Sequence, residues 1–531
     1  MARIGVRTRS DEAEGSLTGG PVRRLLPGVL SVAYLLTLAY LARFHPFGTY
    51  ATETDFYHLF APDAERLAAG RFPENPYQGP GYPAALALVG GIAGDLFTAG
   101  KWISIVAAAL VAYLAFVLFA RLFGYWTGVG AALLVMVSGE FPQFGINATS
   151  DAFFLLLCAV ALVLLAGKRP AARPRAALLG AVTGYAFLTR TNGLFLVPVC
   201  ILGILWLDTF ESRRGERIRL VALFAAVCLL VMSPWMYANW RHHGNPFYNA
   251  NYLNIATEFY PELSEGRTNQ DGTRRLEETF HSFGDVVRFA PGRMLAHYPV
   301  NVLESVRLSA GTLVSPWVGC LALAGAALVA FERRSRTALL LVIAGGLYFL
   351  LLGFIHWESR YYFFIMFLYA GFAIAAAVRL LDLARSRGLL RHRAFDLLPV
   401  ALWLVMFGTS LAYSRGSFAR FLASHPTEVL DACEYLKGAH VTGARILSRK
   451  PHLPYLCRQE WVFFPPAQSL SDFEQWLRRN PVDYVTFSSI ELARRPGLAV
   501  LRDPKRAPAW LEAVWTNPGK ALFVLYRPRL D

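Results

Sequence analysis

Long apolar runs recur along this chain, and short polar or charged segments separate them. Runs near the 20 residues that an α-helix needs to cross a bilayer predict transmembrane helices. They lie at 25–43, 102–120, 125–141, 151–166, 176–189, 193–208, 220–237, 312–331, 337–355, 361–381 and 395–413. The pattern predicts an α-helical polytopic membrane protein with about 11 transmembrane helices.

One further apolar segment, Tyr82–Phe97, is rich in glycine and contains Asp95. Whether it crosses the membrane decides the sidedness of everything after it. If it is a surface or re-entrant helix, the basic N-terminus shares one side with the arginine-rich loops at 168–175, 213–219, 333–336 and 385–393. Because cytoplasmic loops carry the excess of lysine and arginine, we expect the N-terminus inside and the C-terminus outside.

This topology divides the chain into three parts. Residues 1–24 form a cytoplasmic tail, 25–413 a transmembrane domain, and 414–531 an extracytoplasmic part. The transmembrane domain includes a first outer loop at 44–101 and a long outer loop at 238–310. The first apolar run is expected to be a retained anchor rather than a cleaved signal peptide, since further apolar segments follow it.

The part after residue 413 alternates between helix-like and strand-like pieces. Helices are expected at 428–437 and 470–479, and strands at 444–448 and 482–487. Two β-rich runs joined by Asn517-Pro518-Gly519-Lys520 predict a closing hairpin. We expect a small α/β domain without a catalytic motif, in which Cys433 and Cys457 could pair if the domain is extracytoplasmic.

Composition supports a membrane protein. Of the 531 residues, 55% are hydrophobic and 17% are charged, whereas soluble globular proteins hold about 25% charged residues. The net charge of +15 lies mainly in short loops between the apolar runs, where topology explains it. A nucleic-acid partner is therefore not expected, and membrane lipids are.

Two acidic residues on the outer face are candidate catalytic groups. Asp55 lies between the first apolar run and a short helix that begins at Pro62 and stops before Gly70. It is either a solvated loop carboxylate or a base that deprotonates an acceptor hydroxyl. Asp151 opens another span and is either an N-cap or a second acid on the same face. Together they could hold a divalent metal ion or divide base and orienting roles.

Two arginines end spans on the same face, Arg190 after Thr189 and Arg360 before Tyr361. Each could snorkel to the headgroups, but two guanidinium groups beside acids suit a phosphate-bearing lipid. Further candidates for substrate contact are His356, Tyr57, Tyr82 and Lys101, of which Tyr82 could equally be an aromatic of the membrane interface.

The order of these motifs resembles the GT-C class of membrane glycosyltransferases, which use polyprenyl-phosphate sugars. The branch it resembles is the bacterial one related to protein O-mannosyltransferases and lipid A aminoarabinose transferases. The resemblance covers roughly residues 25–385. It rests on Asp55 with Tyr57, Ala61, Ala64, Leu67 and Gly70, on Pro80-Gly81-Tyr82-Pro83, on Ser150-Asp151, on Leu188-Thr189-Arg190-x-Asn192-Gly193 and on Arg360-Tyr361.

The resemblance implies a role for each of these charged residues. Asp55 would be the base that activates the acceptor, Asp151 a second acid near a metal or the acceptor, and Arg190 and Arg360 contacts of the donor phosphate. The sequence departs from the O-mannosyltransferases, which show an Asp-Glu pair, because Phe56 follows Asp55 here and Glu53 precedes it.

The expected function is that of an integral-membrane glycosyltransferase of the cytoplasmic membrane. It would transfer a sugar from a polyprenyl-phosphate donor to a hydroxyl of a lipid, glycan or protein on the extracytoplasmic face, with inversion. A divalent metal ion is a candidate cofactor. The alternatives are a flippase for a lipid-linked sugar and a non-catalytic envelope assembly protein.

Overall fold

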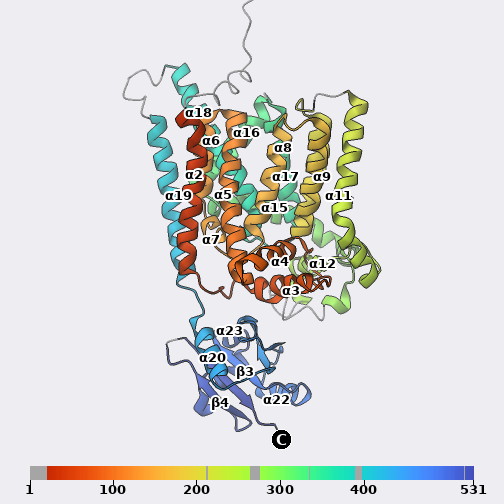
Figure 1. Cartoon of the computed structure of the whole chain (residues 1–531), viewed down its shortest axis with the longest axis vertical. Coiled ribbons are helices and arrows are strands. Elements are labelled where there is room, and N and C mark those ends of the chain that lie inside the picture. Colours follow the sequence, from red (N-terminus) through yellow and green to blue (C-terminus); the bar gives the residue numbers. More distant parts are fainter. Residues whose placement is uncertain are drawn as a thin grey trace, which may run out of the picture.

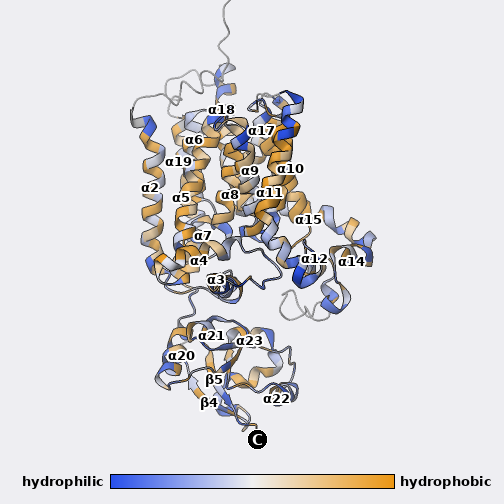
Figure 2. Ribbon diagram, turned by 45° about the vertical axis from the view of Figure 1, so that its right-hand side comes forward, coloured by the Kyte–Doolittle hydropathy of each residue, from blue (hydrophilic) through white to orange (hydrophobic). Residues whose placement is uncertain are grey.

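The computed structural model describes residues 21–210, 213–263, 276–333, 335–388, 398–519 and 521–530. Helices α2, α5, α8, α9 and α11 run roughly parallel in one layer, and a small mixed domain that ends at the C-terminus lies below it (Figure 1). Apolar residues make up most of the upright helices, whereas apolar and polar residues mix along the lower domain (Figure 2).

The upright helices follow the predicted apolar runs. The described ones are α2 (Pro21–Leu41), α5 (Leu96–Phe123), α6 (Tyr125–Val137), α8 (Asp151–Ala166), α9 (Ala172–Thr189), α10 (Leu196–Trp206), α11 (Arg214–His243), α16 (Pro316–Glu332), α17 (Arg336–Leu352), α18 (Phe363–Ser386) and α19 (Leu398–Leu422). A further helix, α15 (Pro291–Thr312), lies within the segment predicted as the long outer loop and was not predicted. In α18, nearly every side chain from Phe363 to Ala377 is buried, which makes this helix the centre of the apolar core.

Four helical stretches in the described ranges are both long and apolar enough to cross a membrane. They are Arg23–Phe44, Leu96–Phe123, Arg214–His243 and Ser359–Ser386. Six shorter apolar helices accompany them, at Gly81–Ala93, Tyr125–Val137, Asp151–Ala166, Thr191–Trp206, Pro316–Glu332 and Arg336–Leu352. A polytopic helical protein is therefore confirmed, while the count of 11 crossings stays a prediction.

The ambiguous apolar segment forms α4 (Gly81–Ala93) at the lower edge of the helical layer (Figure 1). Its 13 residues span about 20 Å, less than the roughly 30 Å of a bilayer core. Leu88 and Ile92 are exposed on it. A Cβ on Gly81 would lie 2.6 Å from the Thr189 nitrogen, so a glycine is required where α4 meets the end of α9.

The first outer loop contains the predicted short helix. A π-helical turn, η2 (Phe56–Phe60), leads directly into α3 (Ala61–Ala68), which has Pro62 in its first turn. After α3 the chain turns at Gly70, whose φ of +71° is a left-handed conformation that glycine adopts without strain.

The C-terminal domain begins with α20 (Thr427–Gly438) and holds a five-stranded sheet in the order β2-β1-β3-β5-β4. The strands are β1 (Arg445–Ser448), β2 (Glu460–Phe463), β3 (Tyr484–Ser488), β4 (Leu511–Thr516) and β5 (Phe523–Pro528). β1 pairs in parallel with β2 and β3, and β4 and β5 form the predicted antiparallel hairpin. The strand β2 was not expected, because its four residues at the sheet edge show no alternation.

Three further α-helices and a disulfide belong to this domain. The helices are α21 (His452–Leu456), α22 (Leu470–Arg479) and α23 (Ser489–Arg494). Cys433 in α20 is bonded to Cys457 after α21, with Cα atoms 5.6 Å apart. The predicted small α/β domain is therefore present.

The first outer loop and the C-terminal domain share one apolar core. Phe56, Tyr57 and Phe60 belong to the same buried cluster as Leu453 and Ile446. The Tyr57 ring lies 4.5 Å from that of His452, and the His58 ring lies 4.6 Å from that of Trp461. The segment that carries Asp55 therefore packs against the C-terminal domain.

Candidate functional site

Asp55 precedes the first residue of η2, and its side chain is 34% exposed. Arg360 Nη1 lies 3.3 Å from Asp55 Oδ2, although 305 residues separate the two. The first outer loop and the segment before α18 thus place a carboxylate against a guanidinium. The Asp55 carboxylate therefore remains partly accessible.

Asp151 forms a second ion pair, which is buried. It is the first residue of α8, and Arg190 directly follows α9. Arg190 Nη1 lies 2.5 Å from Asp151 Oδ1 and also donates to Ser150 Oγ at 3.3 Å. The Asp151 side chain is 1% exposed, and its Oδ2 has no hydrogen-bond partner among the described residues.

Tyr361 joins the two ion pairs into one site. The Arg190 guanidinium carbon lies 5.3 Å from the centre of the Tyr361 ring, and that of Arg360 lies 5.1 Å from it. Both distances are within the range of a cation–π interaction. Arg360 also interacts electrostatically with both Asp55 and Asp151. The structure therefore brings together the two acids and the two arginines that the sequence singled out, whereas the candidate Lys101 lies elsewhere.

Glu358 and His356 lie at the edge of this site. Arg360 Nε donates to Glu358 Oε2 at 2.6 Å, and His356 Nε2 lies 3.3 Å from Glu358 Oε1. Burial raises the pKa of Glu358, but Arg360 and His356 outweigh it and lower that pKa to about 2. Glu358 is therefore ionised at neutral pH and holds Arg360 in place.

Three candidate contact residues are engaged within the protein. The Tyr57 hydroxyl accepts a hydrogen bond from the Gly48 nitrogen at 2.9 Å. Tyr82 is fully buried, with its ring 5.0 Å from that of Phe60. The Lys101 ammonium donates to the carbonyl oxygens of Ala42 and His45, at 3.3 and 2.9 Å.

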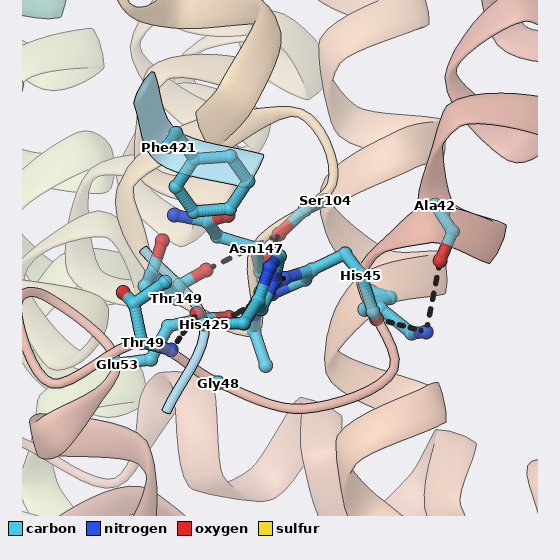
Figure 3. A network of polar contacts seen from close by, with 12 residues as sticks. Ala42, His45, Gly48, Thr49, Glu53, Ser104, Asn147, Thr149, Phe421 and His425 are labelled. Atoms are coloured by element: carbon cyan, nitrogen blue, oxygen red, sulfur yellow. Dashed lines mark hydrogen bonds and ion pairs between the residues drawn. The ribbon is translucent and has the colours of Figure 1, made fainter. Parts of the chain in front are cut away.

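A buried polar network holds the first outer loop in position (Figure 3). Glu53 Oε1 lies 2.8 Å from His45 Nε2 and accepts from the Ala148 nitrogen at 3.0 Å, while Oε2 accepts from the Thr49 nitrogen at 2.9 Å. Burial raises the pKa of Glu53, but His45 and these donors outweigh it, and the net pKa is lowered. His45 Nδ1 in turn lies 2.5 Å from His425 Nε2. Glu53 lies two residues before Asp55, and His425 lies just after α19. The network therefore connects the first outer loop to the chain after α19.

A lysine of the C-terminal domain also reaches the site. Lys450 Nζ donates to Thr54 Oγ1 at 2.9 Å, directly beside Asp55. The two residues are 396 positions apart, and no motif around Lys450 distinguishes it from other lysines. Sequence reasoning could not have found it.

The acids do not form a metal-binding group. No cluster of three or more histidine, cysteine, aspartate or glutamate residues suited to a metal ion occurs in the described part of the chain. Asp55 and Asp151 each have a carboxylate oxygen paired with an arginine. The positive charge of the arginine opposes the binding of a metal cation at the same carboxylate. The residues present therefore do not fit a divalent metal ion.

Comparisons with known proteins agree on one class. Residues 76–238 match the family described as dolichyl-phosphate-mannose-protein mannosyltransferase. Among solved structures, the apo oligosaccharyltransferase of Archaeoglobus fulgidus is 15% identical, with a TM-score of 0.58 over 88% of this chain and 70% of that one. ArnT from Cupriavidus metallidurans bound to undecaprenyl phosphate is also 15% identical, with a TM-score of 0.58 over 94% and 97% of the two chains. No curated protein sequence matches the chain.

The chain therefore has the fold of the GT-C class of membrane glycosyltransferases. The match of residues 76–238 to the mannosyltransferase family and the fold shared with ArnT agree with the resemblance drawn from the order of the motifs.

Proposed function

We propose that this protein is an integral-membrane glycosyltransferase that uses a polyprenyl-phosphate sugar and transfers the sugar to a hydroxyl acceptor. The observation that supports it most is the joining of the Asp55–Arg360 and Asp151–Arg190 pairs around Tyr361. A partly exposed acid beside two guanidinium groups provides both groups that such a transfer needs, a base and an anion-binding site.

In the proposed transfer, the acid and the two arginines act on different atoms of the substrates. The acceptor hydroxyl gives its proton to Asp55, and its oxygen attacks the anomeric carbon of the donor sugar. The bond between that carbon and the phosphate oxygen breaks, and the polyprenyl phosphate leaves with the bonding electron pair. Attack opposite the leaving group inverts the anomeric centre. Arg190 and Arg360 stabilise the negative charge that develops on the phosphate.

Asp151 has a different role from Asp55 in this reaction. It is almost fully buried and bonded to Arg190, so it orients that guanidinium rather than meeting the acceptor. No step requires a metal ion. A zinc ion is named for one structure of the Archaeoglobus oligosaccharyltransferase, but the two acids of this chain are occupied by arginines.

The donor and the sidedness are supported by separate observations. ArnT is described as bound to undecaprenyl phosphate, and the archaeal enzyme as bound to dolichol-phosphate and an inhibitory peptide, so a lipid phosphate suits this fold. The loop charges favour 11 crossings, with the N-terminus in the cytoplasm. The site and residues 414–531 would then face outward.

The experiment is a donor screen with the full-length protein in nanodiscs that contain lipids of the native envelope. A panel of undecaprenyl-phosphate hexoses and pentoses is supplied, and mass spectrometry measures free undecaprenyl phosphate and new glycosides. We expect release from at least one donor together with a glycosylated product. Movement of a donor across liposome membranes without any product would instead indicate a flippase.

A further inference from the structure

Lys450 contacts the first outer loop although it belongs to the C-terminal domain, in the segment between β1 and α21. The Thr54 hydroxyl donates its proton to the Tyr50 carbonyl at 2.8 Å, which leaves its oxygen to accept from Lys450 at 2.9 Å. This pattern fixes the direction of both hydrogen bonds. Thr54 is the residue before Asp55, so the ammonium group is held at the start of the site.

The segment around Lys450 is anchored independently of that contact. His452 Nε2 lies 3.0 Å from the Thr49 carbonyl oxygen, and its ring packs against those of Tyr50 and Tyr57, with ring centres 4.9 and 4.5 Å apart. These contacts hold the backbone just after Lys450 against the first outer loop.

Charged and titratable groups from three elements surround the ammonium group. They are Asp55 in the first outer loop, Arg449 and His452 on either side of Lys450, and Glu491 and Arg494 in α23. Burial and Arg449 lower the pKa of Lys450 to about 8, while Asp55 and Glu491 oppose that shift. Lys450 is therefore charged at neutral pH and loses its proton a little above it.

Of the two acids near Lys450, one is already committed. Glu491 accepts from the Arg449 nitrogen at 2.9 Å and from the Ser488 nitrogen at 2.8 Å, as part of the cap of α23. Asp55 is paired with Arg360 and is also an electrostatic neighbour of Lys450, so it lies between this lysine and the arginines of the site. If Lys450 served only to connect the C-terminal domain to the first outer loop, it would need the hydrogen bond to Thr54 but not a positive charge.

We propose that Lys450 is a positioning residue of the transfer site, whose ammonium group orients Thr54 and stabilises the ionised carboxylate of Asp55. The C-terminal domain then forms part of the active site rather than an appendage to it. The assignment of this role to transfer rests on the glycosyltransferase function proposed above.

The electrostatic part can be tested without turnover. Competitive acylation of the full-length protein by acetic anhydride, read by mass spectrometry, gives the pH midpoint at which Lys450 becomes reactive. We expect a midpoint near pH 8 in the wild type, lower by about one pH unit in Asp55→Asn, because a neighbouring anion is lost. The midpoint of Lys437, an exposed lysine of the same domain, should not move. An unchanged Lys450 midpoint in Asp55→Asn overturns the proposal.

Turnover of the donor found in the screen tests the role in transfer. Lys450→Met should lower kcat about tenfold or more throughout the pH–rate profile, with little change in donor KM. Lys450→Arg should retain most of the rate and extend activity above pH 8, whereas Lys437→Met should match the wild type.

Two outcomes separate the proposals. A Lys450→Met profile that superimposes on that of an active wild type contradicts the role of Lys450 alone. No turnover by the wild type with any donor contradicts the glycosyltransferase function, while the acylation midpoints still decide whether Lys450 and Asp55 are coupled. If Lys450→Met fails to fold, the pH–rate profile of Lys450→Arg is the test. A Lys450→Arg profile that does not extend above pH 8 contradicts the positioning role of Lys450.

Discussion

Asp55 and Asp151 are the same residue type in different surroundings. Asp55 is one-third exposed and 3.3 Å from its arginine, whereas Asp151 is buried and 2.5 Å from Arg190. A base must exchange protons with substrate, while an acid that orients a guanidinium must not. The difference in burial therefore supports the two proposed roles without reference to any relative.

Glu53 allows a prediction at the same scale, because its carboxylate is fully buried among donors. Glu53→Gln leaves His45 without its anionic partner, and breaking a buried pair costs about 3–5 kcal/mol. We expect a lower thermal midpoint in detergent at pH 7, with no comparable change in Glu65→Gln, which alters an exposed acid.

The pH dependence of that loss has a defined sign. Since the folded pKa of Glu53 lies below its usual 4.5, its contribution to stability is present above pH 4.5 and is lost as the pH falls through the folded value. The difference in thermal midpoint between the wild type and Glu53→Gln should therefore become smaller at acidic pH. A gap that is constant down to pH 3 would mean that the network does not depend on the ionised form.

The sequence predicted part of this site. Asp55, Asp151, Arg190 and Arg360 could be grouped because each lies next to an end of a span on one side, and the loop charges identify that side. Their chemical roles stay predictions. Lys450, His45 and His425 could not be found, since their contacts join residues 380 or more positions apart and depend on how the domains pack.

At the scale of elements, the first outer loop is held from two sides. Below it, its aromatic residues share a core with the C-terminal domain, and behind it the Glu53 network reaches His425 (Figure 3). Local sequence signals identified α3 and the β4–β5 hairpin because proline, glycine and alternation mark their ends. They could not indicate that these elements belong to one apolar cluster.

The disulfide of the C-terminal domain allows a prediction about the stability of that domain. Cys433 and Cys457 close a loop across α20 and β1, 24 positions apart. Removing a link of this length costs about 2–4 kcal/mol, mainly through the unfolded chain. Cys433→Ser combined with Cys457→Ser should make residues 414–531 more sensitive to protease at moderate temperature.

A control separates the disulfide from lost packing. Cys200→Ser alters a buried thiol in the helical layer and should not change cleavage of the C-terminal domain. Equal sensitivity of the wild type with and without reductant would show that the bond does not form in the cell.

At the scale of the whole molecule, the orientation follows from charge rather than from helix length. Only four described helices meet both length and hydropathy requirements, yet the basic loops alternate consistently if α4 does not cross. The position of α4 at the lower edge of the helical layer agrees with that assumption (Figure 1). The predicted orientation of the protein in the membrane therefore depends on whether α4 crosses it.

Cysteine labelling tests this orientation. In a Cys320→Ser background, Glu460→Cys should react with a membrane-impermeant maleimide in intact cells, because β2 would lie outside. Lys168→Cys should react only after permeabilisation, since its loop would be cytoplasmic. The reverse pattern would invert the topology and move the proposed site to the cytoplasmic face.

The central claim is that Asp55 is the base of a glycosyl transfer. Its most direct test is the rate at which purified Asp55→Asn and wild-type protein release undecaprenyl phosphate from the active donor, with Glu65→Gln as the control. We predict a loss of about 10²- to 10⁴-fold in kcat for Asp55→Asn, with folding and undecaprenyl phosphate binding retained. A rate for Asp55→Asn within a few-fold of the wild type would contradict the assignment.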